Sequence, residues 1–105
     1  MPRFDNPIEY QLAAEAAAAL GRSGRLLRKA LDALEKYDRD VLARARRADP
    51  VIRSGLVASA GEAFWGYVVQ REALGLLDPE YIAKEYGVPP EVQQAMGPKT
   101  RSREP

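Results

Sequence analysis

Apolar residues recur at three- and four-residue steps along the first half of the chain. Leu20, Leu27, Leu31, Leu34 and Val41 follow this spacing, which places them on one face of an α-helix. The basic side chains of the same segment fall mainly off that face. The pattern predicts one long amphipathic helix over residues 7–48.

Cap-and-proline signals mark where the helices begin. Asn6 and Pro7 supply an amide cap and a proline in the first turn, and Glu9 is placed to reach back to the cap. Similar signals, together with glycines that end helices, occur three more times. They predict helices over residues 50–74, from Pro79 to Gly87, and from Pro90 to Gly97.

Two glycines interrupt the first helical pattern. A break at residues 21–24 is the alternative to one continuous helix, because Gly21 and Gly24 together cost about 2 kcal/mol of helix propensity relative to Ala. Ala17, Gly21 and Gly24 share one face, however, where their small side chains would let another helix approach closely. We therefore expect the helix to continue through this segment.

The second helix is apolar nearly all the way round. Leu56, Phe64 and Tyr67 lie on one face, while Trp65 and Val69 lie on another. Such a helix must be covered on both sides, by the first helix and by either the C-terminal segment or a second subunit. Because large apolar side chains are few in a chain of 105 residues, self-association is the expected source of additional burial.

These elements predict an all-α fold: a long antiparallel helical hairpin with two short C-terminal helices, forming a dimeric helical bundle. Residues 1–97 are expected to be a single helical domain and residues 98–105 a disordered tail, since the tail has no large apolar residue.

Composition excludes several kinds of chemistry. The chain has no Cys and no His, which removes the usual transition-metal ligands and the side chain that most often transfers protons near neutral pH. We expect no catalytic residue, no metal site and no cofactor. The most apolar stretch, residues 56–77, contains Glu62, Arg71 and Glu72, so no membrane span is expected and the predicted location is the cytoplasm.

Charge is distributed unevenly although the net charge is only +1. Residues 22–48 carry nine bases and four acids, whereas residues 49–97 carry three bases and seven acids. The favoured interpretation is a basic first helix lying along an acidic second one, within or between subunits. The alternative is a nucleic-acid-binding surface.

The favoured function is a non-enzymatic, homo-oligomeric scaffold or adaptor that also binds another protein. Aromatic and arginine side chains dominate binding hot spots, and one such group lies within two turns of the second helix, although its favoured assignment is to the core. At least one of Arg71 and Glu72 is expected to be paired across an interface, Arg71 for example with an acid of the first helix such as Glu35 or Asp38. The residues assigned to the oligomer or partner interface are Ala17, Gly21, Gly24, Phe64, Trp65, Tyr67 and Arg71.

The alternative function is a small nucleic-acid-associated regulator that uses the basic stretch 22–47, the basic tail and a degenerate helix-turn-helix at residues 81–96. Ala83, Gly87 and Val88 resemble the first half of a helix-turn-helix over residues 81–96, although a structural element that clasps the bundle is favoured over a DNA reader. For the arginines at residues 44–47, the favoured interpretation is also structural: cations at the C-terminal end of the first helix interact favourably with its carbonyl groups. The candidate nucleic-acid contacts are Arg44, Arg46, Arg47, Arg53, Gln93, Gln94, Lys99, Arg101 and Arg103.

Three stretches resemble a family of short bacterial proteins of unknown function. They are ALGRSGR at residues 19–25, WGYVVQRE at residues 65–72 and YGVPPEV at residues 86–92. The resemblance extends over residues 6–97. It implies a helical fold and a bacterial cytosolic setting, and it carries no activity or ligand that could be transferred.

Overall fold

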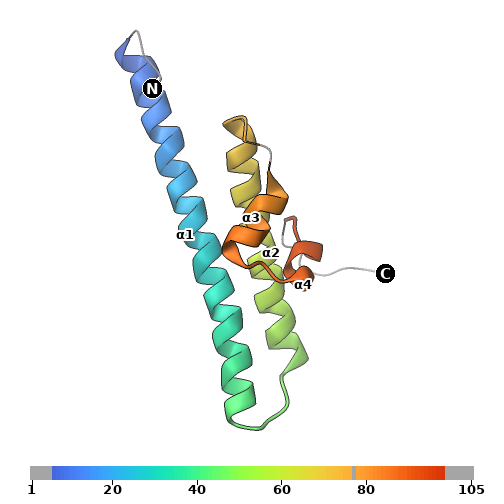
Figure 1. Cartoon of the computed structure of the whole chain (residues 1–105). Coiled ribbons are helices and arrows are strands. Elements are labelled where there is room, and N and C mark those ends of the chain that lie inside the picture. The colour runs from blue at the N-terminus through green and yellow to red at the C-terminus, as the bar shows by residue number, and fades with distance from the viewer. Residues whose placement is uncertain (1–5, 77, 99–105) are drawn as a thin grey trace.

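A computed structural model describes residues 6–76 and 78–98. Two long helices, α1 and α2, form an antiparallel hairpin, and two short ones, α3 and α4, lie across one side of it (Figure 1). Their bounds are α1 Pro7–Ala43, α2 Pro50–Ala73, α3 Pro79–Tyr86 and α4 Pro90–Gln94. The described ranges contain no β-strand, and the predicted all-α class is confirmed.

The beginning and the continuity of α1 follow the sequence prediction. The Asn6 side chain accepts a hydrogen bond of 2.8 Å from the Glu9 N–H, and Pro7 occupies the first turn. The helix then runs unbroken through Gly21 and Gly24.

The end of α1 differs from the prediction, because the helix stops at Ala43 and not near residue 48. Ala45 adopts a left-handed conformation with φ 51°, and the Arg46 N–H then bonds the Val41 carbonyl at 3.2 Å. Residues 44–49 are needed as a connection, since the chain must cross to a helix whose axis lies about 8–10 Å away. The segment consists of good helix formers, so its sequence gave no sign of this requirement.

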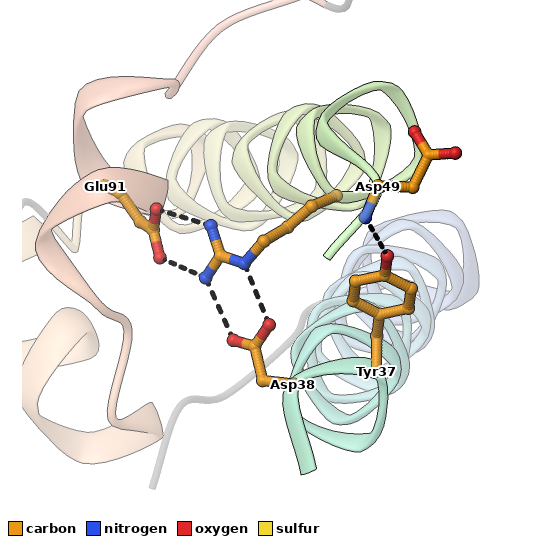
Figure 2. Close-up of polar contacts among 5 residues, drawn as sticks. Tyr37, Asp38, Asp49 and Glu91 are labelled. Atoms are coloured by element: carbon orange, nitrogen blue, oxygen red, sulfur yellow. Dashed lines mark hydrogen bonds and ion pairs between the residues drawn. The ribbon is translucent and has the colours of Figure 1, made fainter. Parts of the chain in front are cut away.

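The start of α2 is capped as predicted. The Asp49 carboxylate accepts hydrogen bonds from the Val51 and Ile52 N–H groups, at 2.9 and 3.3 Å. The Asp49 N–H in turn donates to the Tyr37 hydroxyl at 2.8 Å, as Figure 2 shows. This bond ties the connection to α1 and fixes where the chain reverses.

Glycines end α2 and α3. Gly75, with φ 82°, follows α2, and the Leu76 N–H bonds the Arg71 carbonyl at 2.8 Å. Gly87, with φ 67°, closes α3 in the same manner. Both stops were predicted from the glycines.

The core lies where α3 and α4 cover the hairpin. It combines leucines of α1 with apolar side chains of all three other helices. Its main members are Leu27, Leu31, Leu34, Ala60, Phe64, Tyr67, Val68, Ile82, Ala83, Val88 and Val92. Among the described residues no polar or charged side chain is buried, so the core is held by apolar packing.

Two glycines allow the close packing of this core. A Cβ on Gly24 would lie 2.9 Å from the Tyr86 hydroxyl oxygen and 3.2 Å from Tyr67 Cε1. A Cβ on Gly61 would clash with the backbone carbonyl of Ala95, just beyond α4. Gly24 thus admits tyrosines of the same chain, and Gly61 admits the segment that follows α4.

The described chain is elongated. Its dimensions are 59 × 34 × 21 Å and its Cα radius of gyration is 16.9 Å, against roughly 13 Å for a compact chain of this length. The first ten residues of α1, 7–16, contain no buried side chain, and Figure 1 shows them extending away from α2. We call this segment the N-terminal arm. No helix within the described residues is long and apolar enough to cross a membrane.

Candidate functional site

An open groove runs between α1 and α2. Its volume is about 460 Å³, and none of its lining residues comes from α3 or α4. Small side chains form most of its surface: Ser23, Ala30, Ala33, Ser59, Ala63 and Gly66. Leu26 also lines it, and Lys29 and Glu62 contribute one charge of each sign. We call this feature the α1–α2 groove.

Large apolar side chains are exposed next to the groove and along the N-terminal arm. Ile8 is 68% exposed, Leu12 64% and Leu26 61%. On α2, Trp65 is 38% exposed, so the second face of this helix is not fully covered by its own chain. Uncovered apolar side chains of this size are typical of sites that another macromolecule covers.

A tyrosine pair occupies the opposite side of α1. The Tyr67 and Tyr86 rings are 5.4 Å apart in an edge-on arrangement, and Arg28 lies 5.1 Å from the centre of the Tyr86 ring. Arg28 also donates to the Tyr86 carbonyl at 3.2 Å. Burial, followed by the neighbouring Tyr67, raises the pKa of the Tyr86 hydroxyl. The cluster joins α1, α2 and α3 and covers Gly24.

Arg71 does not pair with α1, and the expectation of Glu35 or Asp38 as its partner is wrong. Its guanidinium donates two hydrogen bonds, of 3.1 and 2.9 Å, to the Asp78 carboxylate. These bonds raise the pKa of Arg71. Asp78 precedes α3 but gives that helix no side-chain cap, because its carboxylate is engaged by Arg71.

Arg53 holds three parts of the fold together. Its guanidinium binds the Asp38 carboxylate of α1 at 2.8 and 2.9 Å and the Glu91 carboxylate of α4 at 2.9 and 2.7 Å, as Figure 2 shows. Hydrogen bonds from Arg53 lower the pKa of both acids, and the two acids raise the pKa of Arg53. Four of the five N–H groups of this side chain are bonded to the two carboxylates, so its role is structural.

The candidate nucleic-acid contacts are dispersed. Arg44, Arg46 and Arg47 are exposed in the connection between α1 and α2. Arg53 is engaged by two acids, and the Gln93 side chain donates to the Val88 carbonyl at 2.9 Å. Gln94 is exposed. The remaining three, Lys99, Arg101 and Arg103, lie outside the described residues, as does most of the predicted tail.

The 81–96 element packs against the bundle. Ala83 and Val88 are buried on either side of the left-handed Gly87, which is the arrangement expected of a helix-turn-helix corner. The second helix, α4, has only five residues, and its Val92 is fully buried. The apolar side of α4 therefore faces the protein, and its Glu91 is held by Arg53.

The predicted interface residues divide into two groups. Gly24, Phe64 and Tyr67 are buried within their own chain, and Arg71 is bound to Asp78. The others, Ala17, Gly21 and Trp65, are exposed.

Sequence reasoning missed Ile8, Leu12 and Leu26. The signal that could have found them is their spacing: Leu12 and Leu26 lie fourteen residues, or two heptads, apart on one face, separate from the core stripe.

Comparison with known proteins identifies the family of the chain and no further relative. A search of curated proteins and a search of solved structures gave no significant match. The model of a family of unknown function, DUF6665, matches residues 4–104 and so covers nearly the whole chain. The chain therefore belongs to the DUF6665 family of unknown function.

Proposed function

We propose that this protein is a non-enzymatic, self-associating helical scaffold or adaptor of the cytoplasm. The observation that carries the proposal is the uncovered apolar surface formed by the N-terminal arm and the α1–α2 groove. A chain with a thin core leaves three large aliphatic side chains more than half exposed on this surface. Burying one such side chain contributes about 1.5–3 kcal/mol, so covering them together would drive association.

A second exposed region is available to another protein. Trp65 and Val69 lie on α2 and are each exposed by more than a third. A partly exposed tryptophan beside an aliphatic residue supplies the kind of anchor that protein interfaces use. This region supports the adaptor role, in which self-association and partner binding use different surfaces.

The nucleic-acid alternative has weaker support. Arg53 and Gln93 are committed to contacts inside the protein, and the described part of α4 carries no Lys or Arg. A major-groove reader needs cations near the phosphates on the element that enters the groove. Among the described residues, the exposed bases over residues 22–47 and the exposed Gln94 remain for that role.

Light scattering tests the proposed function. We expect the mass at micromolar concentration to be a multiple of 11.6 kDa, most simply twice that value. A monomer across the micromolar range would contradict the proposal. Labelled duplex DNA at two salt concentrations tests the alternative, since tight binding that weakens steeply with salt would favour the nucleic-acid role.

A further inference from the structure

A second apolar stripe on α1 is symmetric about Ala19. Its members Ile8, Leu12, Ala19, Leu26 and Ala30 are separated by four, seven, seven and four residues. At about 100° per residue they fall on one side of the helix, away from the core leucines. Leu26 and Ala30 line the α1–α2 groove, while Ile8 and Leu12 belong to the N-terminal arm.

A palindromic stripe of this kind fits an antiparallel copy of itself. We propose that two copies of this chain pair α1 against α1 in antiparallel register, with Ala19 of each copy at the twofold axis. In this register Leu12 meets the partner's Leu26, and Ile8 meets the partner's Ala30. The proposal rests on the proposed self-association and adds the surface, the orientation and the register.

The shape of the α1–α2 groove supports a second copy of the chain as its occupant. The groove is lined mainly by Ala, Ser and Gly, and the N-terminal arm carries the large side chains Ile8 and Leu12. Pairing around Ala19 places the arm of each copy over the groove of the other. Large side chains then enter a small-residue groove, which is how close-packed helix interfaces are built. The seam from Ile8 to Ala30 is about 35 Å long at 1.5 Å per residue.

Charge selects the antiparallel orientation. The described residues from Asn6 to Gly21 carry two acids and no base, whereas residues 22–29 carry four bases and no acid. An antiparallel pair sets the acidic arm of one copy against the basic segment of the other, and a parallel pair would set like charges together.

One pair of charges lies at the edge of the seam. Glu15 and Arg22 are seven residues apart on the same edge of the stripe, so antiparallel pairing brings Glu15 next to the partner's Arg22 twice per dimer. Within residues 6–76 and 78–98, neither side chain forms an ion pair or a side-chain hydrogen bond, so both are available for the contact.

Cysteine cross-linking tests the register, because the chain contains no cysteine of its own. Ala19→Cys should give a disulfide-linked dimer under mild oxidation. The matched control Ala17→Cys, on the opposite side of α1 beside the tyrosine pair, should not. Leu12→Cys alone should not cross-link, whereas a mixture of Leu12→Cys and Leu26→Cys chains should form the mixed disulfide.

Charge reversal tests the orientation independently. We expect Glu15→Arg and Arg22→Glu each to raise the dimer dissociation constant by about tenfold or more, since each change turns two attractive pairs into repulsive ones. The double variant Glu15→Arg/Arg22→Glu should return the constant to near that of the unmodified chain. Circular dichroism verifies that every variant remains helical.

The outcomes separate this inference from the proposed function. Cross-linking of Ala19→Cys and of the mixed pair, with rescue by the double reversal, supports the antiparallel seam. A stable dimer that cross-links through Ala17→Cys and ignores both charge reversals overturns the seam and leaves self-association standing. A protein that is monomeric by light scattering overturns both.

Discussion

Gly21 and Gly24 lie three residues apart in α1 but have different surroundings. A Cβ on Gly21 would meet only the Arg25 guanidinium, at 3.4 Å, which can move aside. A side chain on Gly24 would enter the contact with Tyr67 and Tyr86. The sequence indicated that this face was suited to a close approach, but it could not show that tyrosines from α2 and α3 make the approach.

This difference predicts opposite effects on stability. Gly21→Ala should raise the free energy of unfolding by about 1 kcal/mol, because it removes a helix-destabilising glycine without a clash. Gly24→Leu should lower it by about 1–3 kcal/mol through overpacking. Urea denaturation followed by circular dichroism measures both. Equal stability of the two variants would show that the tyrosines do not pack on Gly24.

The ion pairs of Arg53 with Asp38 and Glu91 predict that the free energy of unfolding depends on pH. Arg53→Gln should lower the free energy of unfolding at pH 7 by about 0.5–1 kcal/mol, a modest loss because all three side chains of the network remain in contact with water. The pKa values of Asp38 and Glu91 lie below their ordinary values of 3.8 and 4.5 in the folded protein. The stabilisation is therefore present above pH 4.5 and is lost as the pH falls through the lowered values.

Denaturation of the two proteins from pH 7 to pH 2.5 provides the measurement. The curves of the unmodified chain and Arg53→Gln should converge at the acidic end. A constant difference in unfolding free energy down to the lowest pH would contradict a role for the two carboxylates.

At the scale of the elements, the starts and most of the stops of the helices could be predicted because their causes are local. Asn6 and Asp49 bond to N–H groups two or three residues away, and Gly75 and Gly87 adopt conformations that glycine favours. The end of α1 could not be predicted, since it depends on where α2 lies. The pairing of Arg71 with Asp78 was missed for a similar reason: it depends on how the chain turns after α2.

The backbone just after α1 is strained at one residue, and a substitution should relieve this strain. Ala45 has φ 51°, a conformation that costs an L-residue roughly 1 kcal/mol and that glycine adopts freely. Ala45→Gly should therefore raise the free energy of unfolding by about 0.5–1 kcal/mol after the greater flexibility of glycine in the unfolded chain is counted. Thermal denaturation measures the effect, with Ala17→Gly, at an exposed position inside the helix, as a control that should be destabilising.

At the scale of the whole molecule, the elongated shape could be predicted from the long first helix, but its use could not. The core stripe of α1 dominates the sequence pattern, and the weaker stripe through Leu12 and Leu26 becomes visible only when the structure shows which leucines the chain itself covers. The candidate site thus consists of apolar side chains that packing within the chain leaves exposed. A single sequence does not show which apolar side chains the chain itself buries and which remain exposed for a partner.

Self-association predicts that the melting temperature rises with protein concentration, because mass action favours the dimer. Leu12→Asp should abolish this dependence by placing a charge in the interface. Leu42→Asp makes the same substitution at an exposed position near the other end of α1 and should preserve it. Scanning calorimetry over a hundredfold range of concentration distinguishes the two. Persistence of the dependence in the Leu12→Asp variant would assign the contact to a different surface.

The arrangement of ionic contacts around an entirely apolar core has a consequence for local opening. Arg53 and Arg71 join the C-terminal helices to the hairpin from the rim, where water can replace their partners at little cost. We therefore expect residues 78–95 to detach as one cooperative unit without leaving a charge in the interior. Amide hydrogen exchange in α3 and α4 would then report a single free energy of opening, lower than that of the centre of α1.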